Sequence, residues 1–328
     1  MGQVGRRQFL IATGALLAAP PAIWAQPAKK VRVGYLSSNP PSDTQAAIDA
    51  FRIRLRQLGY VEGQTLFMEY RYAQGKFDLL PELAAELVKL KVDVMFAYGT
   101  PAALAAKNAT KTIPVVFGGV NDPLTVGLVT DLRRPGGNVT GVTTNNSELS
   151  AKRLSLLKEA IPTISRVAVL ANPEFTPTSN MLAQMRLASQ ALAVQLHVLE
   201  ARAPEEIAAA FARVSSLKPD AIVVLPDPWF LSQRARIVEL AMSSRIPAMY
   251  HLRQYLEVGG LMAYGPTYVE SFQQSAALVD KIVRGARPAN LPVEQPWRYE
   301  VAINLKAARA LGLTIAQSLL LRADVVIE

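Results

Sequence analysis

Short apolar runs alternate along the chain with longer segments in which apolar residues recur every three or four positions. VRVGYLS (31–37) is largely apolar, as is typical of a strand buried on both faces. TQAAIDAFRIRLRQLGY (44–60) has the spacing of an amphipathic helix. The alternation continues with expected strands at 66–73, 92–99 and 113–119 and expected helices at 77–90 and 100–109. This order predicts an α/β fold whose parallel sheet is covered by helices on both faces.

The second half of the chain repeats this order of elements. LVKLKVDVMFAYG (87–99) resembles VSSLKPDAIVVLPD (214–227), and TIPVVFGG (112–119) resembles RIPAMYHL (245–252). Self-similarity of this kind indicates two units built on one plan. The second unit has expected strands at 166–172, 196–201, 220–227 and 246–252 and expected helices at 179–194, 205–218 and 230–244. We therefore predict two lobes, each a doubly wound parallel sheet.

The boundaries of the lobes follow from the repeat. We expect the N-terminal lobe at 31–140 and the C-terminal lobe at 145–264. RRPGGNVTGVTTNN (133–146), rich in Gly, Asn and Thr, lies between them and is the expected first crossover. The chain is expected to return to the first lobe within 265–285 or through the C-terminal segment, and 286–328 is expected to be a C-terminal crossover segment.

Residues 1–25 differ in composition from the rest of the chain. A basic start, MGQVGRR, precedes the short apolar run FLIATGALLAA and the segment PPAIWA, an order that predicts a secretory signal peptide cleaved near Ala25. RRQFL (6–10) also resembles the twin-arginine export signature. The apolar run is too short to span a bilayer. Its alternative is an apolar helix packed on the domain, whereas the signal peptide predicts export to the periplasm.

Cysteine usage and charge narrow the expected partners. The chain has no cysteine, so we expect no disulfide, no thiolate metal site and no lipid anchor of the bacterial lipoprotein kind. The formal net charge is +9, and removal of the two arginines in residues 1–25 leaves +7. The basic residues are spread along the chain and are not interleaved with aromatic residues. This distribution favours a solvated surface and no nucleic-acid partner.

Motifs of common reactions are absent from the sequence. There is no GxSxG elbow, no GxxxxGK[ST] loop and no HExxH pair, and GGNVTG (136–141) has the wrong spacing for GxGxxG. Of the two histidines, His197 lies within an expected strand. His251 lies at the end of an expected strand, where its side chain could reach a cleft. The sequence therefore favours a protein that is not an enzyme and that has neither a cofactor nor a metal.

Polar groups collect where the expected strands end. In YGTP (98–101) a Gly permits unusual backbone angles, Thr100 is a good N-cap, and Pro suits the first helical position. The free N–H groups of such a helix start suit a carboxylate. In the second half the corresponding strand ends at Asp227 followed by Pro228. Ligands of open α/β sheets bind beyond the carboxyl ends of the strands, so both turns are candidate ligand contacts, although simple capping would explain each.

Other side chains near the strand ends could complete a site. Asp122 and Asp227 suit an ammonium or hydroxyl partner, with helix capping as their alternative role. Aromatic residues could cover an apolar ligand, or could instead belong to the core: Tyr98, Phe117, Trp229, Tyr250 and Tyr264.

The sequence resembles a family of ABC-transporter substrate-binding proteins whose characterised relatives take up tryptophan or tyrosine. RRPGGNVTGV (133–142) and the ending ALGLTIAQSLLLRADVVIE (310–328) carry the resemblance most specifically. It also rests on VRVGYLSS, FRIRLRQLGYVEGQTLFMEYRYAQGKFDLLPELAAELV, AYGTPAALAAKNATKTIPVVF, NDPLTVGLVTDLRRPGGNVTGVT and NLKAARALGLTIAQSLLLRADVVIE. Together these segments extend over residues 31–328.

The resemblance implies the type I periplasmic-binding-protein fold, in which two lobes joined by three crossovers close by hinge motion on one small ligand. It also implies docking on a permease. By position, the implied ligand contacts are Ser37, Ser38, Gly99, Thr100, Asp122, Asn172, Thr178, Ser179 and Asp227, to which the aromatic pattern adds Trp229 and Tyr264. The identity of the ligand does not transfer, because pocket-lining side chains vary among members.

These observations predict an exported, soluble, monomeric solute-binding protein of an ABC importer, with an amino acid or a related carboxylate as its ligand. Two alternatives stay open at the level of sequence. One is a ligand-sensing module that docks on a membrane receptor. The other is a periplasmic enzyme that uses His251 with Asp227 or Asp122.

Overall fold

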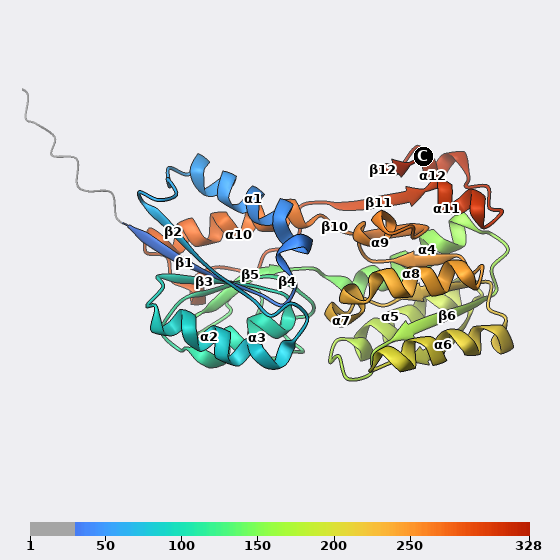
Figure 1. Cartoon of the computed structure of the whole chain (residues 1–328), viewed down its shortest axis with the longest axis horizontal. Helices are drawn as coiled ribbons and strands as arrows, with labels where there is room; N and C mark the ends of the chain where they lie inside the picture. Colours follow the sequence, from blue (N-terminus) through green and yellow to red (C-terminus); the bar gives the residue numbers. More distant parts are fainter. Residues whose placement is uncertain (1–29) are drawn as a thin grey trace, which may run out of the picture.

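The computed structural model of the chain describes residues 30–328, which fold into two α/β lobes lying end to end (Figure 1). The predicted signal peptide, residues 1–25, lies outside the described residues. Within 30–328 no helix combines the length and apolar character that a membrane crossing requires.

The first lobe contains a five-stranded sheet in the order β2-β1-β3-β4-β5, with every neighbouring pair parallel. Its strands are β1 (Val31–Ser37), β2 (Leu66–Tyr72), β3 (Val94–Tyr98), β4 (Val115–Val120) and β5 (Val139–Thr143). The central strand β3 is buried at all of its residues, which explains its uninterrupted apolar sequence.

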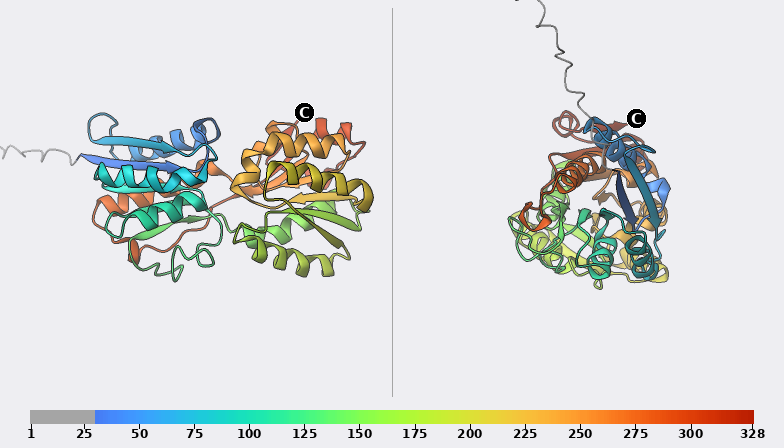
Figure 2. Two further views of the ribbon diagram at one scale, coloured as in Figure 1. Left: turned by 60° about the horizontal axis from the view of Figure 1, so that its bottom comes forward. Right: turned by 90° about the vertical axis from the view of Figure 1, so that its left-hand side faces the viewer.

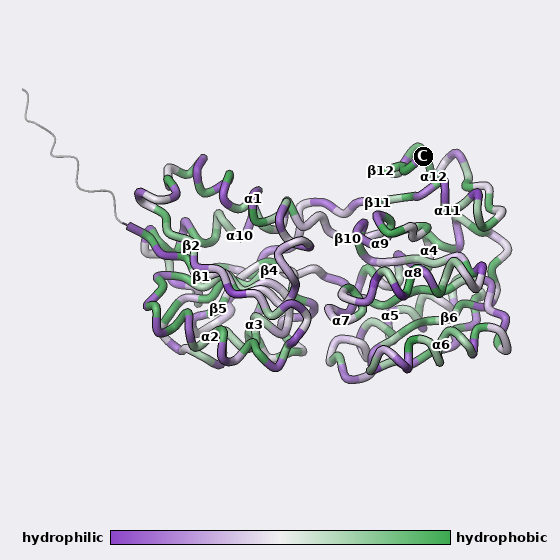
Figure 3. The backbone as a smooth tube through the Cα atoms, in the orientation of Figure 1, coloured by the Kyte–Doolittle hydropathy of each residue, from purple (hydrophilic) through white to green (hydrophobic). Residues whose placement is uncertain are grey.

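Helices cover both faces of this sheet. One face carries α1 (Pro41–Gln57) and α10 (Tyr268–Val283), which share a core with the strands that includes Phe51, Phe96 and Phe272. The other face carries α2 (Leu80–Lys89) and α3 (Thr100–Ala109). The short 3-10 turns η1 (Phe77–Leu79) and η2 (Pro288–Asn290) complete the lobe. Figure 3 shows the alternation of hydrophobic and hydrophilic residues along such helices.

The second lobe repeats the strand order of the first. Its seven-stranded sheet has the order β12-β11-β10-β9-β8-β6-β7, in which β7-β6-β8-β9-β10 corresponds to β2-β1-β3-β4-β5. The strands are β6 (Arg166–Ala171), β7 (Gln195–Glu200), β8 (Ala221–Val224), β9 (Ala248–Tyr250), β10 (Met262–Pro266), β11 (Tyr299–Asn304) and β12 (Val325–Ile327). The predicted fold class of two doubly wound lobes is confirmed.

Two strands depart from the expected parallel arrangement. β11 pairs with β10 antiparallel and β12 pairs with β11 parallel, so both run opposite to the other strands of the second sheet, whose remaining neighbours are parallel. The parallel strands of this lobe end at the lobe boundary. The chain enters β11 from that boundary, so β11 has to run away from it, opposite to its neighbour.

Helices also cover both faces of the second sheet. One core contains apolar residues of α4, α5, α11 and α12, and the other contains those of α6, α7, α8 and α9. Their bounds are α4 (Asn146–Ala160), α5 (Thr178–Ala191), α6 (Pro204–Leu217), α7 (Pro228–Ser232), α8 (Arg234–Ser243), α9 (Gln254–Glu257), α11 (Leu305–Ala310) and α12 (Gln317–Leu320).

The chain crosses between the lobes at three places in the described part, and Figure 2 shows segments passing between them. The first crossing lies between β5 and α4. Much of the segment predicted as this crossover instead belongs to the first lobe, because 139–143 form β5. The second lies at Thr267, between β10 and α10. The third leads into β11 after Glu294, whose carbonyl accepts from Thr143 N at 3.0 Å.

Candidate functional site

Apart from β11 and β12, the strands of both sheets end at the lobe boundary, where their loops line a cavity of about 30 Å³. This volume has room for about one or two water molecules. An amino acid would therefore enter only when the lobes move apart. The cavity is lined from both lobes by Asn39, Tyr98, Gly99, Gly119, Asn121, Thr144, Asn146, Asp227, Pro228, Leu231, His251 and Tyr268.

The turn YGTP forms part of the wall on the first lobe. Gly99 has φ 90°, a conformation that glycine adopts readily, and α3 begins at the next residue. The hydroxyl of Ser38 accepts the N–H of Ala102 at 3.2 Å and so supplies the capping bond of this helix. The hydroxyl of Thr100 accepts the N–H of Asn121 at 3.3 Å. Gly99 thus lines the cavity, and Ser38 and Thr100 support its wall.

Asp227 is the acidic group of the cavity. One carboxylate oxygen accepts the N–H of Phe230 at 2.8 Å, and the other accepts Nδ2 of Asn172 at 3.0 Å. The residue is only 4% exposed. Burial raises the pKa of its carboxyl to about 6, and the two hydrogen bonds offset only part of that rise. Asp227 therefore caps α7, as expected. It also presents to the cavity a carboxylate whose negative charge is destabilised by burial.

His251 lines the cavity beside Asp227. Its side chain is buried, and within the described part of the chain its Nδ1 has no hydrogen-bond partner. Burial, and then the positive charge of Arg153, lower its pKa well below the ordinary value for histidine. The imidazole is therefore neutral near pH 7. No hydrogen bond joins it to Asp227, whose oxygens are already engaged by Asn172 and Phe230.

Two tyrosines from different elements form an aromatic corner. The rings of Tyr98 and Tyr268 meet edge to face, with centroids 5.2 Å apart. The Cβ that Gly119 lacks would lie 2.5 Å from the ring of Tyr98, so glycine is needed for this close approach. The corner gives the cavity an apolar side that complements its polar residues.

The other residues predicted for the site lie around the cavity. The Ser37 hydroxyl donates to the carbonyl of Asn39 and accepts its N–H. The Thr178 hydroxyl donates to the carbonyl of Asn172 at 2.7 Å. Ser179 is exposed, Trp229 lines a separate surface groove, and the carbonyl of Tyr264 accepts from Arg153. Of the residues singled out in the sequence, Tyr98, Gly99, Asp227 and His251 line the cavity, and Asn172 positions Asp227.

Contacts between the lobes lie on both sides of the cavity. On one side, Arg234 at the start of α8 donates two hydrogen bonds to Asp43 of α1, at 2.8 and 3.0 Å. On the other, Nδ2 of Asn180 in α5 donates to a carboxylate oxygen of Asp122 at 2.6 Å. Asp122, predicted as a ligand contact, thus contacts the opposite lobe here. Both contacts favour the closed arrangement of the lobes.

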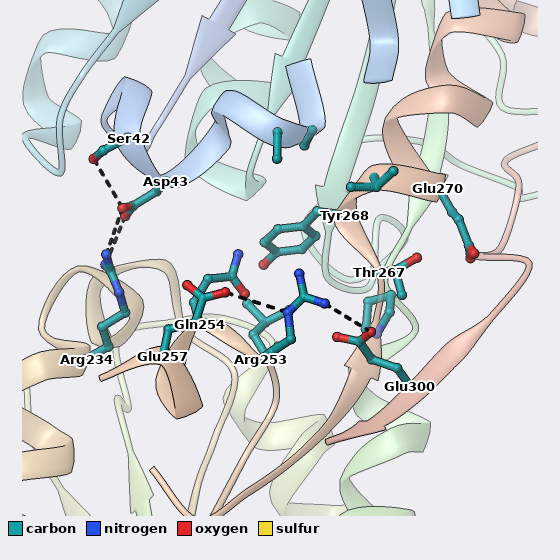
Figure 4. Close-up of a pocket in the computed structure, with 15 residues that line it drawn as sticks. Ser42, Asp43, Arg234, Arg253, Gln254, Glu257, Thr267, Tyr268, Glu270 and Glu300 are labelled. Atoms are coloured by element: carbon teal, nitrogen blue, oxygen red, sulfur yellow. Dashed lines mark hydrogen bonds and ion pairs between the residues drawn. The ribbon is translucent and has the colours of Figure 1, made fainter. Parts of the chain in front are cut away.

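A groove of about 340 Å³ opens beside the Asp43–Arg234 pair and shares Tyr268 with the cavity (Figure 4). Arg253 lies between Glu257, at 3.6 Å, and Glu300, at 4.0 Å. Burial raises the pKa of Glu300. Two sets of ion pairs, Asp43–Arg234 and Arg253 with Glu257 and Glu300, thus lie along this groove.

Several cavity residues were missed at the level of sequence. Asn39, Asn121, Thr144, Asn146 and Tyr268 were not named as ligand contacts, although Asn39 and Asn121 follow closely on expected strands. Thr144 and Asn146 belong to the TTNN run that ends the expected crossover. Polar residues in a crossover that begins at a strand end are a signal that could have identified them. Within the described residues no cluster of His, Cys, Asp or Glu could hold a metal ion.

Comparison with known proteins agrees with this architecture. The sequence matches the family model "ABC transporter substrate binding protein" over residues 39–327. It is 28% identical over 290 residues to a tyrosine-binding protein of Clostridioides difficile, covering 87% of this chain and 81% of that protein. A conserved domain protein of Vibrio cholerae has a similar solved structure, with a TM-score of 0.85 and 28% identity over 91% of this chain and 100% of that one.

A second solved structure shows a relative with a ligand. It is an ABC domain from Streptococcus pneumoniae in complex with L-Trp, with a TM-score of 0.85 and 26% identity, covering 91% of this chain and 100% of that chain. The family match extends over nearly all of the described residues. The chain belongs to the ABC transporter substrate-binding protein family and has its type I periplasmic-binding fold.

Proposed function

We propose that this protein binds a free amino acid with an aromatic side chain in the cavity between its lobes and delivers it to an ABC importer. The family consists of substrate-binding proteins and not of enzymes. The observation that carries the proposal is the chemistry of the cavity, where the Asp227 carboxylate faces amide groups and an aromatic corner contributed largely by the other lobe.

The cavity offers complementary partners for each part of such a ligand. Asp227 suits the ammonium group, because a buried carboxylate gains most from a partner of opposite charge. The amide of Asn121 suits the carboxylate, whereas at the start of α3 Ser38 already accepts the N–H of Ala102 and Pro101 has none. Tyr98 and Tyr268 suit an aromatic ring. The relatives named for tyrosine and solved with L-Trp support the same class of ligand.

Delivery to an importer requires that the protein act outside the cytoplasm and release its ligand at a permease. The basic and apolar order of residues 1–25 supports export, with cleavage near Ala25. The narrow cavity between the lobes and the three crossings of the chain between them support a hinge motion that opens the site. The permease partner, the absence of a lipid anchor and the monomeric state belong to the same proposal.

A thermal-shift screen of the protein lacking residues 1–25 tests this function. L-tyrosine and L-tryptophan are expected to raise the Tm, because a ligand that binds only the folded state stabilises it by RT ln(1 + [L]/Kd). L-lysine and L-glutamate serve as controls, since each would bring an unpaired charge to the aromatic corner. A Tm that responds to none of the aromatic amino acids, in protein refolded to remove any co-purified ligand, would contradict the proposal.

A further inference from the structure

Arg153 is a buried cation without a carboxylate partner. It lies on α4 of the second lobe and is 0% exposed. Among the described residues its guanidinium donates only to neutral oxygens: the carbonyl of Tyr264 at 2.8 Å, and the carbonyl and side-chain oxygens of Asn146. Burial lowers its pKa to about 9, so the group stays positively charged near neutral pH. A buried charge is ordinarily paired, so this arrangement calls for an explanation.

The contact with Arg153 fixes the orientation of the Asn146 amide. Arginine has five N–H donors and no acceptor, so the side-chain oxygen of Asn146, and not its NH₂ group, has to face the guanidinium. The NH₂ group is thereby directed toward the first lobe. It donates to Oδ1 of Asn121 at 2.5 Å and to the hydroxyl of Thr144 at 2.9 Å.

The same logic fixes the Asn121 amide. Its oxygen accepts from both Asn146 and Thr144, which uses its two lone pairs. Its NH₂ group is left to face away from them, and none of the hydrogen bonds in the described part of the chain uses it. Asn121 is 5% exposed and lines the cavity. The Asn121 NH₂ group therefore stays accessible from the space between the lobes and has no partner among the described residues.

We propose that Arg153, acting through Asn146, orients the Asn121 amide so that its NH₂ group donates a hydrogen bond into the cavity. The acceptor of this hydrogen bond is the carboxylate of the ligand. Arg153 is then a positioning residue. The positive charge of Arg153 also attracts the ligand carboxylate, because among the described residues no negatively charged side chain is buried beside Arg153. This inference rests on the proposed function and names the part of the ligand that faces the first lobe.

Asn121→Asp tests the donor directly, because it replaces the NH₂ group by an acceptor of nearly equal size. The two probes are L-tyrosine and tyramine, which keeps the ammonium and the ring but lacks the carboxylate. The wild type is expected to prefer L-tyrosine by about 10- to 100-fold in Kd, the range for one hydrogen bond to a charged group. The variant should lose that preference, and its affinity for tyramine should not fall.

The control variant is Asn145→Asp. Asn145 lies in the same crossover, but its amide contacts Glu148 and it does not line the cavity. It should keep the wild-type preference for L-tyrosine. An Asn121→Asp variant that keeps the preference as well would overturn the proposal.

Asn146→Asp separates the relay from a merely structural role. The new carboxylate pairs with buried Arg153 and should raise the Tm. It cannot donate to Asn121, so the Asn121 amide is free to turn its oxygen toward the cavity. Affinity for L-tyrosine should therefore fall while stability rises. A variant whose affinity is unchanged would overturn the relay, and so would one that loses stability together with affinity for both probes.

The amino-acid ligand and the Asn121 donor can be tested separately. If the wild type binds neither L-tyrosine nor L-tryptophan, the amino-acid assignment is wrong. The donor is then tested with phenylacetate against phenylacetamide, which differ only at the group that Asn121 would meet. Preference for phenylacetate, lost in Asn121→Asp, supports the donor. Equal binding, preference for the amide, or no binding of either contradicts it.

Discussion

Replacement of Asp227 by Asn is expected to lower the affinity for an amino acid by about 30- to 5000-fold near neutral pH. Removal of one partner from a buried, hydrogen-bonded ion pair costs roughly 2–5 kcal/mol, which corresponds to this range. Asp227 is the acid that lines the cavity, and its burial leaves the carboxylate with much to gain from an ammonium partner. Titration calorimetry with L-tyrosine measures the loss.

Asp220→Asn is the matched control for this change. Asp220 precedes the same strand, β8, at the end away from the cavity, and accepts the N–H groups of Ser165 and Arg166 at 2.7 and 2.8 Å. Its replacement should leave the affinity unchanged. An Asp227→Asn variant that binds as tightly as the Asp220→Asn variant would remove Asp227 from the ligand site.

The raised pKa of Asp227 also sets a pH dependence. Below about pH 6 the carboxyl is protonated, so affinity for an ammonium ligand falls as the pH falls through that value. The ligand-free protein shows the opposite trend. The folded state holds this proton more tightly than the unfolded state, whose pKa is about 3.9, so stability falls as the pH rises from about 4 to about 6, by about 3 kcal/mol from this group. Asp227→Asn should lack both effects.

Replacement of Arg234 by Gln shifts the lobes toward the open arrangement and weakens binding by about tenfold. Arg234 donates two hydrogen bonds across the lobe boundary to Asp43, whose side chain is 7% exposed. A partly buried bidentate pair is stronger than a surface ion pair, and its loss leaves the Asp43 carboxylate both unpaired and buried only when the lobes are closed. The closed state therefore loses stability relative to the open state. X-ray scattering of the ligand-free variant should give a larger radius of gyration.

Arg236→Gln is the control for the lobe contact. Arg236 lies on the same helix but pairs with Glu239 within that helix, and its side chain is 50% exposed. Its replacement should change neither the radius of gyration nor the affinity. In a double-mutant cycle, Asp43→Asn should add little to Arg234→Gln, because both remove one interaction. Additive losses would show that the two residues act separately.

The alternation of apolar strands and amphipathic helices was sufficient to predict the two lobes. Inner parallel strands such as β3 and β8 are buried on both faces, so their sequences are distinctive, and the repeat of the order showed the second lobe. The strands β11 and β12 were not predicted, because 286–328 was expected to be a crossover segment, and their pairing at the edge of the second sheet depends on tertiary contacts. The packing of α10 beside α1 likewise depends on a tertiary contact between segments far apart in the chain.

The site was harder to predict than the fold. Strand ends locate the cavity, but neighbouring residues there face in different directions. Asn121 lines the cavity, whereas the next residue, Asp122, has φ 42° and contacts Asn180 of the other lobe. Charged residues attract attention in a sequence, and neutral amides do not. The hydrogen bonds from Arg153 to Asn146 and from Asn146 to Asn121 form only when the first crossover brings the two lobes together.

The central claim is that the cavity between the lobes binds an aromatic amino acid. Isothermal titration of L-tyrosine and of L-tryptophan into the refolded protein lacking residues 1–25 tests it most directly. We expect one-to-one saturable binding of at least one of them, weakened in Asp227→Asn and in Asn121→Asp. Absence of binding by both amino acids, or binding that neither substitution affects, would contradict the claim.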